Sequence, residues 1–151
     1  MDRREELVRE EDRAFAELSL ALRHVPPGRL EDPVLPQGWS VRDLLWHLAC
    51  WYAECARALE RIRLGTYEGW EEDTDALNAR FLEEGRRQDP ETVRATLAAA
   101  RTRMLQELWA FPGGRPPPEA VAWFAESGPE HEREHLGDLR AGFPGPQAPP
   151  G

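Results

Sequence analysis

The sequence contains no lysine, because all 19 of its basic residues are arginines. This absence excludes every mechanism that depends on a lysine amine, including Schiff-base and pyridoxal chemistry. The basic residues form no cluster either, and 28 acidic against 19 basic side chains give a formal charge of -9. Binding to nucleic acid requires clustered basic residues that displace counterions from phosphates. We therefore expect no nucleic-acid partner.

A long apolar run is also missing, since no stretch approaches the roughly 20 residues that span a membrane. The first six residues are mostly charged, where a signal peptide would be apolar. These features predict a cytoplasmic protein without a membrane partner. Only two cysteines are present, Cys50 and Cys55. On one helix their spacing points them about 140° apart, so we expect reduced thiols rather than a disulfide.

Four long segments carry apolar residues at helical spacing, with charged residues expected on the solvated faces between them. The second segment is the best marked, because Ser40 and Asp43 can form a capping box and Gly65 can end the helix. The fourth contains Gly128-Pro129, which should kink or split it because proline donates no backbone hydrogen bond. The predicted helices span residues 7–25, 41–64, 90–111 and 119–140.

The predicted fold is all-α, a four-helix bundle over residues 1–141, since no segment shows the polar and apolar alternation of a strand. A connection of about 25 residues links the second and third long helices, which is too long for a hairpin and predicts a crossover. Within it, residues 74–84 are expected to form a short helix. Residues 142–151 contain four prolines and three glycines, and they are predicted to be a disordered tail.

Three of the four histidines fall on or beside predicted core-facing positions. His131 and His135 are four residues apart and share a helical face, and His47 borders the apolar face of the second helix. Taken singly, each is more typical of an ordinary core or rim residue. Together, three imidazoles from two helices can occupy one face of a metal ion and leave other positions open. His24 lies at a helix end, where a histidine interacts favourably with the helix dipole.

The segments around these histidines resemble the DinB/YfiT-like superfamily of metal-binding four-helix bundles. The residues that carry the resemblance are Gly38–Trp51, Asp75–Asn78 in the crossover and His131–Arg140. The pattern is most similar to the branch with DfsB and the colibactin self-protection proteins, and is related to maleylpyruvate isomerase and thiol-transferase relatives. The resemblance implies a long second crossover and a divalent metal held by His47, His131 and His135. The resemblance is also consistent with a homodimer in which two bundles pair through their faces, although the sequence identifies no interface for it.

A metal held by three neutral imidazoles could be Zn, Ni, Fe or Mn, and the sequence does not choose among them. Such a metal makes bound water or a bound thiol more acidic, so hydrolysis and transfer from a low-molecular-weight thiol are both accessible. Trp70, in the crossover, is the tryptophan expected to line a substrate pocket. Four carboxylates could move protons there, although each could equally be a surface residue: Asp43, Glu54, Glu134 and Asp138.

The expected function is that of a metal-dependent enzyme acting on a small, electrophilic molecule, in detoxification or stress response. Two alternatives stay open: a protein that sequesters a reactive metabolite without turnover, and a scaffold bundle without a working metal. The stretch His131–His135 also matches the HExxH and HxxEH patterns of zinc proteases. No later histidine or glutamate supplies a further ligand, and no strand is predicted to hold a peptide, so a protease is disfavoured.

Overall fold

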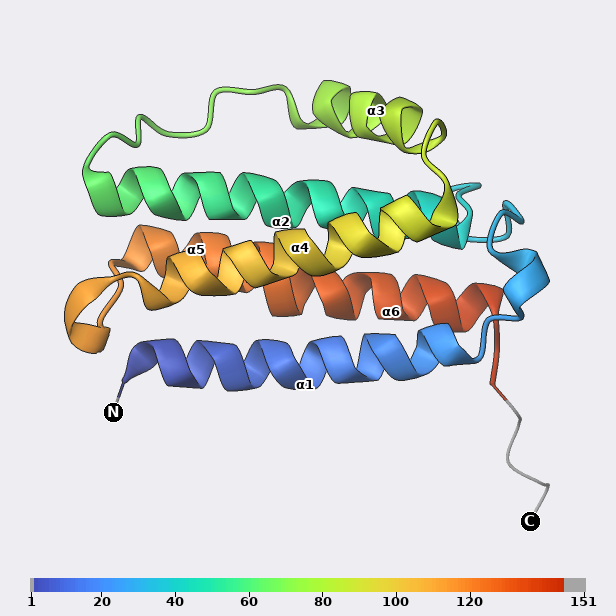
Figure 1. Cartoon of the computed structure of the whole chain (residues 1–151), viewed down its shortest axis with the longest axis horizontal. Helices are drawn as coiled ribbons and strands as arrows, with labels where there is room; N and C mark the ends of the chain where they lie inside the picture. Colours follow the sequence, from blue (N-terminus) through green and yellow to red (C-terminus); the bar gives the residue numbers. More distant parts are fainter. Residues whose placement is uncertain (1, 146–151) are drawn as a thin grey trace, which may run out of the picture.

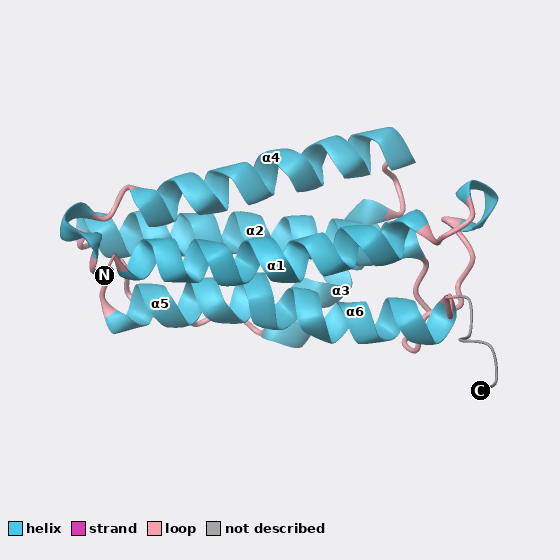
Figure 2. Cartoon of the chain, turned by 90° about the horizontal axis from the view of Figure 1, so that it is seen from below, coloured by secondary structure: helices cyan, strands magenta, loops and turns pink. Residues whose placement is uncertain are grey.

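The computed structural model describes residues 2–145, and all regular structure within them is helical, with no strand. Long helices lie side by side along the long axis of the molecule (Figures 1 and 2). The all-α bundle predicted from the sequence is thereby confirmed. Its four columns are α1 (Arg3–Arg23), α2 (Val41–Leu64), α4 (Pro90–Trp109) and the consecutive pair α5 (Pro118–Ala125) and α6 (His131–Gly142).

The order of the columns explains the long connection in the middle of the chain. The first column, α1, runs in the same direction as α5 and α6, whereas α2 and α4 both run in the opposite direction (Figure 1). Because α2 and α4 are parallel, the chain between them must return along the bundle. Residues 65–89 do so on the outer side of α2 and include the short helix α3 (Thr74–Gly85). The predicted crossover and its short helix are therefore confirmed.

Local sequence signals set the helix ends. At the start of α2, Asp43 N donates to Ser40 Oγ over 3.1 Å and Ser40 N donates to Asp43 Oδ2 over 3.0 Å, which is the predicted capping box. Gly65 ends α2 with a φ of 75°, a left-handed conformation that glycine adopts without strain. Aspartates cap three further helices: Asp2 caps α1, Asp73 caps α3 and Asp89 caps α4.

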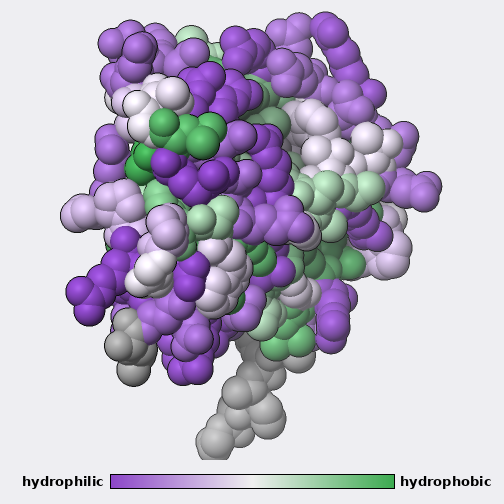
Figure 3. All heavy atoms as spheres, turned by 60° about the vertical axis from the view of Figure 1, so that its left-hand side comes forward, coloured by the Kyte–Doolittle hydropathy of each residue, from purple (hydrophilic) through white to green (hydrophobic). Residues whose placement is uncertain are grey.

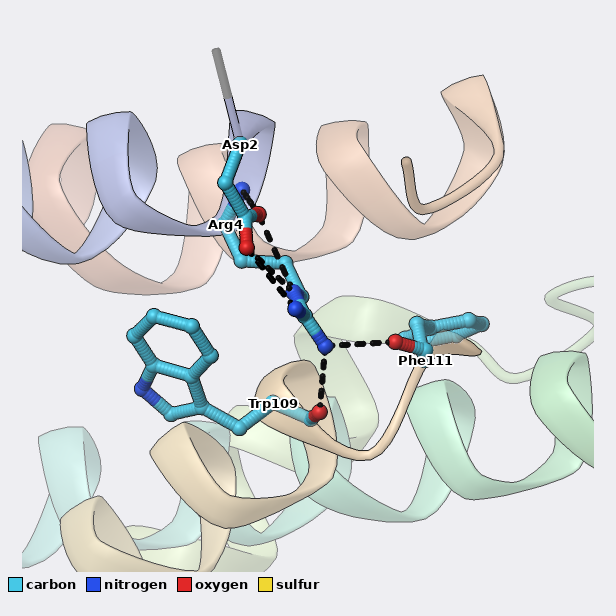
Figure 4. Close-up of polar contacts among 4 residues, drawn as sticks. All are labelled: Asp2, Arg4, Trp109 and Phe111. Carbon is cyan, nitrogen blue, oxygen red and sulfur yellow. Dashed lines mark hydrogen bonds and ion pairs between the residues drawn. The ribbon is translucent and has the colours of Figure 1, made fainter. Parts of the chain in front are cut away.

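One arginine fastens the start of α1 to the end of α4 (Figure 4). Arg4 Nη1 donates to the carbonyl oxygens of Trp109 and Phe111 over 2.8 and 2.7 Å. Asp2, the cap of α1, pairs with the same guanidinium at 2.7 Å. The last carbonyl groups of an α-helix have no hydrogen-bond donor within the helix. Arg4 satisfies the Trp109 carbonyl at the end of α4 and the Phe111 carbonyl just after it, and so links the two helices.

The core is centred on α2, because 12 of its 24 residues are buried. Apolar residues of α1, α4, α5 and α6 pack around it in one continuous cluster. Polar residues cover most of the face drawn in Figure 3, and hydrophobic residues appear there in small separate groups. In the described part of the chain, no helix is both long enough and apolar enough to cross a membrane.

The described structure continues past residue 141, the predicted end of the bundle. Gly142 is the last residue of α6. Phe143 is buried, with 8% of its surface exposed, and the Arg29 guanidinium lies 5.0 Å from the centre of its ring. Phe143 therefore belongs to the core. Residues 146–151 of the predicted tail lie outside the described residues.

Candidate metal centre and its cavity

Three histidines that are far apart in the sequence converge between α2 and α6. His47 lies in α2, His131 begins α6 and His135 follows one turn later. His131 Nε2 lies 3.0 Å from His47 Nε2 and 2.9 Å from His135 Nε2. One ligand atom from each of the three residues can be chosen so that all lie within 4.8 Å of one another. Only 7% of His47 and 3% of His135 is exposed, and His131 is half-buried.

The donor set fits a divalent metal ion. Each ring nitrogen carries either a proton or a lone pair, so His131 Nε2 cannot donate to one neighbouring imidazole and accept from the other. A cation that binds three lone pairs removes that conflict. Zinc–nitrogen bonds of about 2.05 Å at tetrahedral angles place ligand nitrogens about 3.3 Å apart, which is close to the shorter separations in this cluster. The three histidines could therefore hold a metal ion.

A carboxylate fixes the orientation of one imidazole. His135 Nδ1 lies 2.9 Å from Asp138 Oδ2, and a carboxylate can only accept a hydrogen bond there. His135 therefore carries its proton on Nδ1 and leaves the Nε2 lone pair for a metal. His47 differs, because its Nδ1 is buried without a hydrogen-bond partner among the described residues. Its ring is instead packed against Trp39, with the ring centroids 4.8 Å apart.

Burial keeps two of the imidazoles in the neutral form that metals bind. It lowers the pKa of His47 to about 3, with a smaller contribution from the neighbouring His135. Burial also lowers the pKa of His131 to about 3, and the charges of His135 and His47 add to the effect. A metal-binding imidazole must be neutral. His47 and His131 therefore offer lone pairs at neutral pH.

A π-helical turn over Glu126–Glu130 separates α5 from α6. Pro129 lies inside this turn and has no backbone N–H, so it cannot continue an α-helical ladder. The predicted interruption at Gly128-Pro129 is thus present, yet α5 and α6 remain in one column (Figure 2). The turn does not divert His131, whose Nε2 contacts both of the other imidazoles. Single π turns within α-helices often occur at functional sites.

The imidazoles form part of the wall of a cavity of about 650 Å³. Residues of α2, α5, α6 and the crossover contribute to its lining. The volume lies in the range of small-molecule sites. Apart from the histidines, the wall is rich in aromatic side chains, namely Trp39, Trp51, Tyr67, Trp70 and Trp123.

The other residues predicted for the site have different surroundings. Trp70 lines the cavity, and so does the exposed Glu134, which directly precedes His135. Asp43 does not line it, because this carboxylate is buried in the capping box of α2. Glu54 lies in the wall of a smaller neighbouring cavity of about 220 Å³. Among the predicted carboxylates, the fold thus places Glu134 in the cavity wall and Asp138 against a histidine.

The glutamate of the protease-like HExxH pattern lies in the bundle core rather than in the cavity. Glu132 is fully buried, and Tyr52 OH donates to Glu132 Oε2 over 2.5 Å. In zinc proteases this glutamate acts as the general base beside the metal. Glu132 is absent from the cavity lining, so its placement does not support that role.

The two cysteines lie outside the cavity lining, and both are free thiols. Burial raises the pKa of Cys50 to about 12, with smaller contributions from Glu84 and Glu54. Burial likewise raises the pKa of Cys55 to about 12. Because the thiolate is the reactive form of cysteine, both thiols are held in the unreactive form at neutral pH.

Sequence reasoning missed the contribution of α5 to the cavity. Its buried residues, Ala120 and Phe124, face the core. The neighbouring stripe has the spacing i, i+3, i+4 and i+7, which places its members on one helical face. That spacing is visible in the sequence, but only the fold shows that this face meets the histidines. The stripe consists of Glu119, Ala122, Trp123 and Glu126, all of which line the cavity.

Comparison with known proteins gives one family and one similar solved structure. The family described as Mycothiol maleylpyruvate isomerase N-terminal domain matches residues 8–133, a range that includes His47 and His131 and ends before His135. None of the curated proteins compared with the chain matches it. An uncharacterised protein from Escherichia coli UTI89 has a similar structure, with a TM-score of 0.77 and 19% sequence identity. That match covers 94% of this chain and 93% of the other, and at such low identity it shows a shared fold alone.

Proposed function

The chain belongs to the mycothiol maleylpyruvate isomerase N-terminal domain family, among the DinB/YfiT-like proteins, and we propose that it is a metal-dependent enzyme acting on a small molecule. The reaction is hydrolysis or transfer of a thiol, and the biological role is detoxification or stress response. Zn, Ni, Fe and Mn are the candidate metals, because three imidazoles suit all four.

The observation that carries this proposal is the convergence of three imidazole nitrogens in the wall of a cavity sized for a small molecule. His47, His131 and His135 would hold the ion as three protein ligands, the number that catalytic zinc sites commonly use. A divalent metal bound there supplies acidity to a water or thiol that joins it.

Other residues of the chain would orient a ligand, transfer a proton and bind the substrate. Asp138 keeps His135 in the tautomer that presents Nε2 to the cluster. Glu134 lines the cavity beside the histidines and can accept a proton from the substrate or from an attacking group. The aromatic wall binds the apolar or planar part of the substrate and excludes water from it.

In a thiol-transfer reaction, the thiol would come from a low-molecular-weight cosubstrate. Cys50 and Cys55 do not line the cavity, and burial holds both thiols protonated near neutral pH. The name of the family includes a thiol, mycothiol. An external thiol is therefore the source that agrees with both the chain and its family.

A second function, sequestration of a reactive metabolite as in the self-protection branch, is favoured by one observation. Three carboxylates line the cavity, and none of them has a hydrogen bond or ion pair with any other described residue. In catalytic pairs the base is usually oriented by a hydrogen bond to a third group. Consumption of an electrophile by substoichiometric protein would support the enzyme, and consumption that stops at one equivalent would support sequestration.

The metal is tested by elemental analysis of untagged protein purified without chelator. We expect about one divalent ion per chain, and a large loss of it in His47→Ala, His131→Ala and His135→Ala, because each removes one of three ligands. His24→Ala is the matched control, since His24 is exposed at the end of α1 and outside the cluster.

The outcome against the proposal is equally clear. If wild-type protein contains no ion and cannot be loaded with Zn, Ni, Fe or Mn, the metal-dependent reaction is ruled out. Equal loss of metal in His24→Ala would show that the effect does not come from the cluster. Circular dichroism of each variant separates loss of a ligand from loss of the fold.

A further inference from the structure

The cavity extends well beyond the imidazoles, to an end walled by aromatic rings. Trp123 precedes His131 by eight residues in the α5–α6 column, with the π turn between them. The Trp70 ring centroid lies 5.5 Å from that of Trp123 and 5.6 Å from that of Trp51. Tyr67 continues the row at 6.3 Å from Trp123. The crossover thus completes an aromatic enclosure against α2 and α5.

The indole N–H groups of this enclosure are already used within the protein. Each of the three tryptophans donates to an oxygen of a neighbouring residue, so none of these N–H groups is left to bind an anionic ligand. What these rings offer a ligand is the part of their faces that lines the cavity and is not covered by a neighbouring ring, and ring faces carry negative electrostatic potential. The bonds are Trp51 Nε1 to Asn78 Oδ1 at 2.8 Å, Trp70 Nε1 to Thr74 Oγ1 at 3.2 Å and Trp123 Nε1 to Tyr67 OH at 2.8 Å.

The charged side chains of the wall are all acidic. Glu119 of α5 and Glu126, the first residue of the π turn, flank Trp123 in the sequence, and Glu134 lies in α6 beside His135. No arginine is found in the lining formed by residues 2–145. The three carboxylates have no ion-pair partner in that part of the chain. Their charge is therefore available to a ligand.

Ring faces together with unpaired carboxylates suit one chemical class. A quaternary or primary ammonium group is attracted to the faces of tryptophan and tyrosine, and carboxylates beside it strengthen the attraction. An anionic ligand would meet like charge at Glu119 and Glu126 and would find no cationic side chain in the wall.

We propose that the aromatic end of the cavity, at Trp70, Trp123, Glu119 and Glu126, binds an ammonium group of the substrate. The substrate is then an organic cation whose reactive part reaches the imidazoles in the same cavity. This rests on the proposed function only in calling the ligand a substrate, because binding at the aromatic end requires no metal.

The test uses three soluble probes that share a benzene ring and differ in charge: benzyltrimethylammonium, benzyl alcohol and benzoate. Binding to the full-length, metal-free protein is measured by calorimetry and by tryptophan fluorescence at low salt. We expect the cation to bind about tenfold more tightly than the alcohol, which corresponds to a moderate cation–π contribution. Benzoate should bind most weakly, and added salt should reduce the preference for the cation.

Substitutions in the cavity wall test which residues cause the preference for the cation. Glu126→Gln and Trp70→Leu should each reduce the preference for the cation severalfold, since one removes the charge and the other a ring face. Glu130→Gln and Trp109→Leu are the matched controls, because both residues are exposed and lie outside the cavity lining. The controls should leave all three affinities unchanged.

The proposal is overturned if the alcohol or benzoate binds as tightly as the cation, or if none of the probes binds. It is also overturned if the control variants lose the preference as strongly as Glu126→Gln. The two hypotheses fail separately, because the titrations use metal-free protein. Cation binding by a wild-type protein that cannot be loaded with metal would support the ammonium site while the metal-dependent reaction fails.

Discussion

At the scale of single residues, the candidate metal centre depends on a carboxylate that is not itself one of the three converging groups. Asp138→Ala should weaken binding of Zn²⁺ by about 10–100-fold, because His135 loses the acceptor that keeps its proton on Nδ1. Competition with a chromophoric chelator measures the affinity. The number of ions bound at saturation should stay at one per chain.

Gln37→Ala is the control for this substitution. Gln37 Nε2 donates to the same oxygen of Asp138 over 3.1 Å, but among the described residues no hydrogen bond joins Gln37 to His135. Its removal should leave the Zn²⁺ affinity nearly unchanged, because the pair of His135 with Asp138 remains. If both variants bind Zn²⁺ as well as the wild type does, Asp138 has no orienting role.

The histidines could be predicted from spacing, whereas the role of Asp138 could not. A separation of four residues puts His131 and His135 on one face of a helix whatever surrounds them. Asp138 is three residues from His135, so a contact was geometrically allowed. Which of several nearby carboxylates makes that contact depends on side-chain rotamers and on burial, and the sequence pattern carries neither.

At the scale of helices, α3 meets α2 through a glycine. A Cβ atom added at Gly85 would lie 2.6 Å from Trp46 Cδ1 and 2.7 Å from Trp46 Cγ. Gly85→Ala should therefore lower the free energy of unfolding by about 1–3 kcal/mol, the usual cost of overpacking. Urea denaturation followed by circular dichroism measures this change.

A second glycine in a helix tests the same change without the crowding. Gly137 lies in α6 and is exposed, and an added Cβ would meet no atom within 4 Å. Gly137→Ala should raise the free energy of unfolding by about 0.5–1 kcal/mol, because alanine favours helix more than glycine does. If Gly85→Ala and Gly137→Ala change the free energy of unfolding in the same direction, crowding against Trp46 is not the reason for glycine at position 85.

Helix ends were predictable because they depend on neighbours in the sequence. Ser40 and Asp43 form the capping box of α2 with each other's backbone, so no other part of the fold is needed. The turn at Pro129 shows the limit of such reasoning. Proline predicts an interruption, but both a sharp kink and a π turn satisfy it. The bundle keeps α5 and α6 in one column, and this packing selects the π turn.

At the scale of the whole molecule, a buried polar network of two neighbouring pairs contains residues from all four columns. The Arg101 guanidinium of α4 donates to both oxygens of Glu11 in α1, over 2.7 and 2.6 Å. Tyr52 of α2 donates to Glu132 of α6. Burial and the neighbouring Glu11 raise the pKa of Glu132 far above its usual range, so this carboxyl is neutral at pH 7.

The sequence interpretation of charged residues as solvated faces was wrong at this network. Glu11 and Glu132 are each fully buried, although both occur in segments crowded with other charged residues. Composition and periodicity treat such a glutamate as surface. Only the relative rotation of α1 and α6 places these two carboxyls inside the bundle, and that rotation results from the packing of the whole core.

The Arg101–Glu11 pair predicts how the free energy of unfolding changes when one or both of its residues are replaced. Arg101→Met should lower the free energy of unfolding by about 3–5 kcal/mol, because it leaves the buried Glu11 carboxylate without its ion-pair partner. Glu11→Leu combined with Arg101→Met should recover a substantial part of the loss, since two apolar side chains then replace the pair.

An exposed ion pair between α1 and α6 is the control. Glu10 and Arg133 form this pair over 3.1 Å, with side chains 40% and 48% exposed. Removing that pair should cost less than about 1 kcal/mol. Urea unfolding of all variants measures the comparison, and a double variant as unstable as Arg101→Met would show that burial of the unpaired charge is not the cause.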